Sequence, residues 1–129
     1  MAAAPPDARR DALSVRLFEA TLGAFELLSV HLGLDLGLYE NLRAAGPATA
    51  PELAARRGIH ERYAREWLEQ QAVAGLLDVV EASDDPDVRR YALPDAHAEV
   101  LLEPDHLATM APMPKFVMAA ARTWPVLLE

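Results

Sequence analysis

The stretch from residue 49 to residue 93 carries an ordered series of helix boundaries and turn signals. This series limits the folds open to the 129-residue chain more than any other feature. Thr49 and Glu52 have the spacing of a capping box, in which each side chain accepts a hydrogen bond from the other residue's backbone N–H. Gly58 follows at the point where a helix favours a left-handed residue at its end. The pattern therefore predicts a helix that begins after Thr49 and ends at Arg57.

A second helix and a hairpin are predicted directly after the first helix. Residues 60–74 are predicted to be helical, with Gly75 as the stop. Apolar runs at 76–81 and 88–93 flank a cluster of turn-forming residues, which predicts two strands joined by a turn. Two helices joined by a short glycine-containing turn form a helix-turn-helix, and an added hairpin makes it a winged helix. The 25 Ala and 20 Leu residues also favour helix, so we predict a mainly α fold with a small β-hairpin.

Residues 11–33 are predicted to form a long helix that is apolar over most of its circumference. Leu13, Leu17 and Ala24 belong to one face, and Phe18, Leu22 and Phe25 belong to a second face about a third of a turn away. A helix of this kind is buried on two sides, so we expect a partner subunit or a further domain to cover it. A central core helix of a compact α domain is the alternative. The residues that we predict at a dimer interface are Leu17, Phe18, Leu22, Phe25, Leu28 and Leu32.

The same apolar stretch is long enough to raise the question of a membrane span. Arg16, Glu19, Glu26 and Asp35 interrupt it, whereas a span consists of roughly 20 mostly apolar residues. We therefore predict a helix of a soluble protein, and we expect a cytoplasmic location. The absence of cysteine suits that location and excludes thiol catalysis and a Cys-based zinc site.

Further helices are predicted near 95–102, near 105–112 and from 114 onward. The last helix reaches Glu129 without a Gly, Asn or Pro to end it, so we expect the chain to be truncated. Methionine adapts to irregular ligands, so a Met-rich set in this region is a candidate cover for a substrate, with ordinary core or domain-interface packing as the alternative. The predicted substrate-covering residues are Met110, Met113, Phe116 and Met118.

These features divide the chain into three parts. Residues 1–10 are an Ala/Pro-rich N-terminus that we expect to be frayed. Residues 11–103 are predicted to form a winged-helix dimerisation domain with a long N-terminal helix. Residues 104–129 are predicted to form a C-terminal helical connector.

The charge pattern argues against binding to nucleic acid, although many winged helices bind DNA. The chain has 12 Lys and Arg against 20 Asp and Glu, a net charge of −8, and phosphate backbones attract positive surfaces. Arg62 with Glu66, and Arg65 with Glu69, have the i,i+4 spacing at which opposite charges pair on a helix. Aspartates also occupy the predicted wing tip. If the chain is instead a winged-helix transcription regulator, the DNA contacts would come from Arg56, Arg57, Arg62 and Arg65.

The segment HERYAREWLEQQAVAGLLDV, residues 60–79, resembles the N-terminal winged-helix domain of bacterial S-adenosylmethionine-dependent class I methyltransferases. Shorter stretches at 36–42, 49–63 and 93–113 resemble the same domain. The resemblance implies a homodimer in which this domain serves dimerisation and helps to cover the substrate site. It also implies a Rossmann-like methyltransferase domain, in cis or in trans, that binds S-adenosylmethionine.

The glycines of this chain do not supply the cofactor site of such enzymes. None of the six glycines lies two residues from another, so the chain lacks the G-x-G turn that brings backbone close to a nucleotide. We therefore expect no S-adenosylmethionine binding by this chain, and we assign no catalytic, cofactor-binding or metal-binding residues. A dimeric module that binds a small ligand at the subunit interface is a further alternative.

Overall fold

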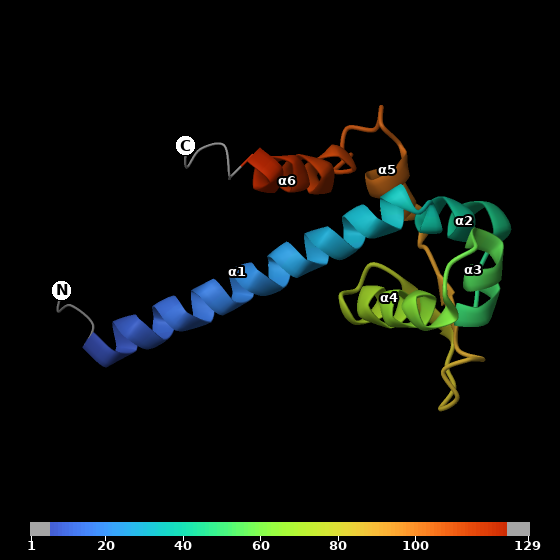
Figure 1. Ribbon diagram of the computed structural model, residues 1–129, viewed down its shortest axis with the longest axis horizontal. Helices are drawn as coiled ribbons and strands as arrows, with labels where there is room; N and C mark the ends of the chain where they lie inside the picture. Colours follow the sequence, from blue (N-terminus) through green and yellow to red (C-terminus); the bar gives the residue numbers. More distant parts are fainter. Residues whose placement is uncertain (1–5, 124–129) are drawn as a thin grey trace.

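The structure is a computed structural model that describes residues 6–123, and within them it has six α-helices and one antiparallel β-hairpin (Figure 1). This confirms the predicted fold, a mainly α winged helix-turn-helix with a long N-terminal helix. In chain order the elements are α1 (Pro6–Asp35), α2 (Leu38–Ala45), α3 (Ala50–Arg57), α4 (Glu61–Val73), β1 (Asp78–Glu81), β2 (Arg90–Ala92), α5 (Asp95–Leu102) and α6 (Pro112–Thr123).

The helix-turn-helix of α3 and α4 begins and ends where the sequence predicts. The Thr49 hydroxyl accepts the Glu52 N–H at 3.4 Å, and the Glu52 carboxylate accepts the Thr49 N–H at 3.0 Å, so the capping box is complete. Gly58 ends α3 in the left-handed conformation with φ of 65°. His60 caps α4, because its Nδ1 accepts the backbone N–H of Arg62 at 3.1 Å. Local side-chain chemistry thus sets both helices.

The core lies where α2, α3, α4 and the last turns of α1 meet. Tyr39 and Trp67 pack edge to face there, with ring centroids 5.0 Å apart. Gly33 of α1 passes directly over this pair, because a Cβ added to it would lie 2.5 Å from the Trp67 ring. Val30, one turn earlier, is also buried. Only the C-terminal end of α1 therefore belongs to the core.

The wing is a short antiparallel hairpin that packs beside the helix-turn-helix. Val79 of β1 pairs with Tyr91 of β2, and Tyr91 also exchanges two backbone hydrogen bonds with Ala48 on its other side. Both strands are shorter than predicted. The N–H groups of Leu76 and Leu77 bond back to the last turn of α4 instead of to a neighbouring strand. These two residues close the helix, so β1 begins only at residue 78.

Three differences from the sequence predictions lie outside the winged-helix motif. Residues 6–10 are helical rather than frayed, since a proline in the first turn and Asp7 beside the helix dipole favour a helix start. Residues 105–111 form turns instead of a helix, because the Met110 N–H donates to the Val100 carbonyl of α5 and Pro112 offers no N–H to continue a helix. The final helix begins at Pro112 rather than 114. The predicted uncapped end at 124–129 lies outside the described residues.

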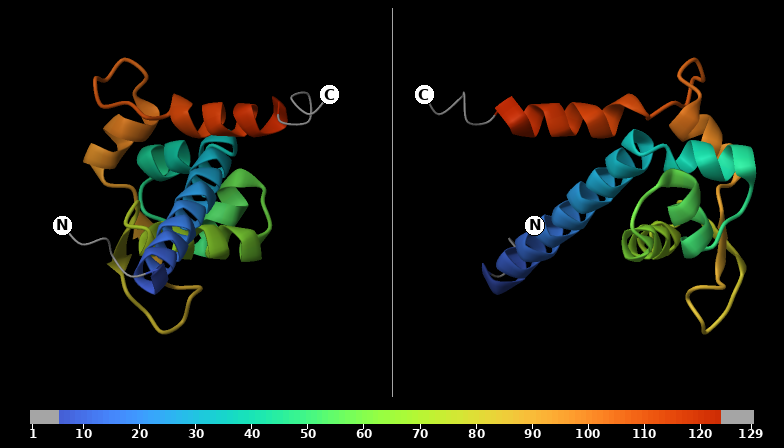
Figure 2. Two further views of the ribbon diagram at one scale, coloured as in Figure 1. Left: turned by 90° about the vertical axis from the view of Figure 1, so that its left-hand side faces the viewer. Right: turned by 45° about the vertical axis from the view of Figure 1, so that its right-hand side comes forward.

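The arrangement of the helices leaves α1 prominent. Figures 1 and 2 show α1 as a long rod that projects from the winged helix, with α6 and α4 on either side of its C-terminal part. The N-terminal half of α1 extends beyond both of them (Figure 1). The described part of the chain is therefore a small packed body with a long, mostly uncovered helix.

Candidate interaction surface

The α1 helix exposes the apolar side chains that the sequence assigns to an interface. The six predicted interface residues are between 41% and 64% exposed, and they run from the middle of the helix almost to its end. They line open grooves along α1, one of which is bordered by Leu17, Phe25 and Leu28 with Ala20, Thr21 and Ala24 between them. The single chain thus leaves both predicted apolar faces of α1 largely open to solvent.

The exposed area of the chain is large for its mass. The chain has a solvent-accessible surface of 8874 Å² and a mass of 14.1 kDa. A compact folded protein of this mass exposes about 6700 Å². The excess is about 2000 Å², whereas each partner of a stable protein interface buries about 800 Å². The surplus surface is thus sufficient for a substantial interface.

By length and composition alone, α1 also passes the test for a membrane-spanning helix. An 18-residue window within residues 7–35 has a mean hydropathy of 1.3. A helix that is buried between protein subunits has the same composition, so this property alone does not identify what covers α1.

A network of polar side chains fixes the base of α1 against α2 and α4. The Trp67 indole N–H donates to the Ser29 carbonyl at 3.0 Å, and the Ser29 hydroxyl donates to Gln70 Oε1 at 2.7 Å. The fully buried Gln71 donates through Nε2 to Ser29 Oγ at 3.1 Å and accepts the Tyr39 hydroxyl through Oε1. Burial raises the pKa of the Tyr39 hydroxyl, which keeps its proton on this hydrogen bond. The direction in which α1 projects is therefore set by specific contacts.

The buried face of α4 differs from the one that helical spacing predicts. Tyr63 lies one turn before Trp67 and is predicted on the same inward face, but Tyr63 is 66% exposed, whereas Ala64, Trp67, Leu68 and Gln71 are buried. Tyr63 instead borders a groove between α4 and α1, together with Glu66 and Leu32. A buried Gln is hard to predict, because its partners Ser29 and Tyr39 come from other helices.

The charges of α4 pair with one another and with the wing. Arg62 and Glu66 form the predicted ion pair at 2.8 Å. The predicted pair between Arg65 and Glu69 is wrong. Arg65 contacts Glu61 at 3.0 Å and Asp87 of the wing, and Glu69 lies 3.4 Å from Arg89. Charged residues of the wing therefore pair with charged residues of α4. The i,i+4 spacing within α4 cannot predict these pairs, because their partners are distant in the sequence.

The other two arginines of the DNA-binding alternative are also occupied within the chain. Arg56 donates to the Gly46 carbonyl at 3.3 Å, and Arg57 donates to the Leu36 carbonyl at 2.9 Å. All four candidate arginines, 56, 57, 62 and 65, thus make intramolecular contacts. A recognition helix instead needs its cationic groups available for phosphates and base edges.

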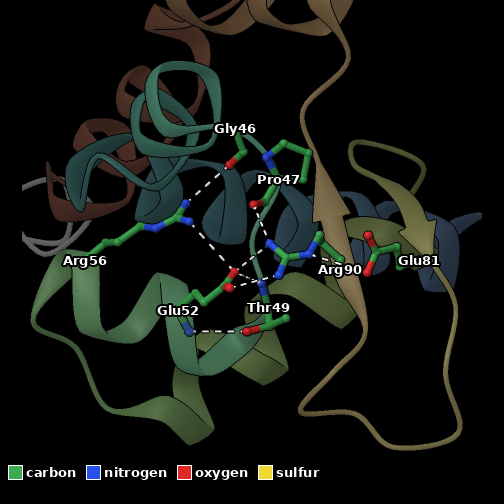
Figure 3. A network of polar contacts seen from close by, with 7 residues as sticks. All are labelled: Gly46, Pro47, Thr49, Glu52, Arg56, Glu81 and Arg90. Carbon is green, nitrogen blue, oxygen red and sulfur yellow. Dashed lines mark hydrogen bonds and ion pairs between the residues drawn. The ribbon is translucent and has the colours of Figure 1, made fainter.

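The positive charge at the base of the wing has a structural partner as well (Figure 3). Arg90 of β2 forms a two-pronged pair with Glu52 of α3, at 2.7 and 2.9 Å, and also donates to the Pro47 carbonyl at 3.0 Å. The hydrogen bonds from Arg90 and from the Thr49 N–H lower the pKa of Glu52. This network joins the wing to the start of α3.

Comparison with known proteins identifies the family of this fold. The sequence profile of the Rv2258c-like winged HTH domain matches residues 24–103. The chain belongs to this family. A search of curated proteins gives no match.

Solved structures that resemble this Rv2258c-like domain include several methyltransferases. The mitomycin 7-O-methyltransferase MmcR is 28% identical with a TM-score of 0.70, over 95% of this chain and 34% of that one. CalO1, a methyltransferase in calicheamicin biosynthesis, is 24% identical with a TM-score of 0.60, over 92% of this chain and 34% of that one. Human N-acetylserotonin methyltransferase is 18% identical with a TM-score of 0.67, over 99% and 35%. The last two show a common fold, and the chain spans about a third of each protein.

The Rv2258c-like domain does not contain a fitting site for S-adenosylmethionine within residues 6–123. A nucleotide site of the Rossmann type needs a strand, a glycine turn and a helix whose N-terminus receives the ligand. The described residues instead hold one antiparallel hairpin, and the glycines with positive φ, namely 37, 46, 58 and 75, adjoin helix ends. The same residues contain no cluster of three potential metal ligands.

The Met-rich segment of the domain lies at its surface. Met110, Met113 and Phe116 are exposed, and Met118 is half-buried on α6. Three of the four predicted substrate-covering residues are therefore open to contact with another domain or a ligand, and their role stays a prediction.

The Glu52–Arg90 pair leads to a test of stability against pH. Glu52→Gln preserves an acceptor for the Thr49 N–H but removes the charge that faces Arg90. Because the folded state lowers the pKa of Glu52 below its ordinary 4.5, the pair stabilises the fold above that pH and this contribution disappears as the pH falls. Near neutral pH the variant should be less stable than the parent by less than about 1 kcal/mol. The effect is small because the Glu52 side chain is 39% exposed, so water and salt screen its charge.

Urea denaturation at neutral pH and near pH 4 measures this difference. The gap in the free energy of unfolding between parent and variant should shrink in acid. Glu40→Gln, on the exposed surface of α2, is the matched control and should change little at either pH. A gap that grows in acid would contradict the assignment of the pair.

Proposed function

We propose that this chain is the N-terminal winged-helix domain of an S-adenosylmethionine-dependent methyltransferase that acts on a small molecule. In this role it serves dimerisation and covers the substrate site, and it is not catalytic alone. The main support for the proposal is that α1 is long, apolar and exposed. In addition, 95% of this chain aligns with about a third of MmcR. An apolar helix of this length needs a cover, and a multidomain dimeric enzyme provides one.

The parts of the domain would have separate tasks in such an enzyme. The α1 helix would hold two copies together in a cytoplasmic homodimer. The α6 helix, with Met113 and Phe116 exposed, would face the catalytic domain and its substrate. S-adenosylmethionine would bind to that catalytic domain, since the residues described here do not fit it.

Calorimetry with S-adenosylmethionine tests whether the cofactor binds to a domain other than this one. Titration of the cofactor into the purified chain should give no binding heat. The coding sequence downstream of the Glu129 codon gives a second test, and it should continue into a strand followed by a glycine-rich turn. Tight cofactor binding by the chain alone would contradict the proposal.

A winged-helix transcription regulator is the second candidate, because the fold is common to both classes. The intramolecular pairing of Arg62 and Arg65 and the acidic wing oppose it. A gel-shift assay with duplex DNA at increasing salt distinguishes the two. DNA binding that weakens steeply with salt would favour the regulator, since phosphate contacts release counterions.

A further inference from the structure

One exposed face of α1 combines apolar, small and charged residues. Positions one heptad apart form two adjoining rows that face the same way, and both rows are exposed or half-exposed. The first row holds Arg10, Leu17, Ala24 and His31. The second row holds Ser14, Thr21, Leu28 and Asp35.

These two rows line two open grooves that follow one another along α1 and share Leu28. Leu17, Thr21 and Ala24 border the first groove, His31 and Asp35 border the second, and together the grooves form one trough. Here α4 packs on one side of α1, through the bond between Ser29 and Gln70, and α6 packs on the other side (Figure 1). Leu28 and Leu32 nevertheless remain 41% and 49% exposed. The residues that line the trough run from 17 to 35, so one further helix fits along it.

We propose that α1 of a second copy of this chain occupies the trough, antiparallel to the first α1, with residue i of one copy opposite residue 45−i of the other. This inference rests on the proposed dimer and specifies its register. In a two-fold symmetric pair each contact occurs twice, so the surface formed by the two rows must be complementary to itself. Each residue of the first row then faces one from the second row.

Charge and size select this register. Arg10 stands opposite Asp35 of the second copy, and Leu17 stands opposite Leu28 of the second copy. The small Thr21 and Ala24 face each other at the centre, where the two helices approach most closely. A shift of one heptad would place Arg10 opposite Leu28, or Leu17 opposite Asp35, and would bury a charge against an apolar side chain. These shifted registers are disfavoured, because each places a charged side chain against an apolar one and away from the opposite charge of the second copy.

Thr21 and Arg10, two polar members of the rows, can be buried in this register. The Thr21 hydroxyl already donates to the Leu17 carbonyl at 2.9 Å, so it needs no partner in the interface. Arg10 pairs with Asp7 and Asp11 only at the exposed surface, where ion pairs contribute little, and is available to Asp35 of the second copy.

The same symmetry covers the second apolar face of α1. A two-fold axis perpendicular to both helices keeps α4 of each copy on the same side of the pair. Leu22 lies one heptad before Ser29, the residue that contacts α4, so Leu22 and its neighbour Phe18 are on that side. They therefore meet α4 of the second copy near its exposed Tyr63, which borders a groove.

Disulfide trapping tests the register directly, because the chain has no cysteine of its own. Two single variants, Leu17→Cys and Leu28→Cys, are purified separately, mixed in equal amounts, allowed to exchange subunits and oxidised mildly. The mixture should give a disulfide-linked dimer in about half of the chains, which is the statistical share of mixed pairs in a two-fold dimer. Each variant alone should give none, because equal positions lie far apart in an antiparallel pair.

Light scattering on the same variants separates failure of the register from failure of the dimer. A dimer by mass without the mixed disulfide would overturn the register and leave the proposed dimerisation in place. A monomer by mass would overturn both. Disulfides in Leu17→Cys alone would place the two copies of residue 17 side by side, which requires parallel helices or another antiparallel register, and would likewise overturn the proposal.

Discussion

Replacing Leu17 and Leu28 together by glutamate should convert the dimer into monomers. Both side chains are at least 41% exposed in the single chain, so the fold itself tolerates the change. In the dimer, the double variant would bury four carboxylates without partners, and each such burial costs several kcal/mol. Since every 1.4 kcal/mol is a factor of ten, association should weaken by more than about a thousandfold.

Analytical ultracentrifugation measures this loss, and circular dichroism checks that the helix content is unchanged. The matched control is Val73→Glu with Leu107→Glu, which adds the same charge at two exposed apolar positions away from α1. The control should stay dimeric. A Leu17→Glu, Leu28→Glu variant that sediments as a dimer would show that α1 is not the interface.

Two identical substitutions on α1 should have opposite effects on stability. Gly33→Ala places a Cβ about where the Trp67 and Tyr39 rings lie, at 2.5 and 2.6 Å, so the rings or the helix must shift. Overpacking of this kind typically costs about 1–3 kcal/mol. Gly23→Ala meets no atom within 4 Å and removes a flexible residue from a helix, which should add about 0.5–1 kcal/mol.

Chemical denaturation monitored by tryptophan fluorescence measures both free energies of unfolding under the same conditions. The two variants carry the same added methyl group on the same helix, so each serves as the control for the other. A Gly33→Ala variant as stable as the parent would contradict the packing of α1 against Trp67. It would also mean that specific contacts do not fix the base of α1.

The elements that could be predicted from the sequence are those set by local chemistry. The capping box of Thr49 and Glu52 and the left-handed Gly58 act within a few residues, and the structure confirms both of them. The apolar circumference of α1 could likewise be predicted, because helical periodicity alone determines it.

The predictions that failed depend on contacts between distant parts of the chain. Gln71 takes the buried position on α4 because Ser29 of α1 and Tyr39 of α2 satisfy its amide, and Tyr63 is left exposed. Arg65 turns to Asp87 because the wing folds back onto α4. Periodicity within a single helix contains none of these neighbours, so the sequence alone could not identify them.

The molar mass of the unaltered chain in solution tests whether a second copy covers α1. We predict a dimer by sedimentation equilibrium, with twice the 14.1 kDa of one chain, over a range of micromolar concentrations. Together with the effect of the α1 substitutions, such a mass would place the dimer interface on α1. A stable mass of 14.1 kDa at every concentration would contradict the proposed dimer, because α1 would then remain exposed in solution.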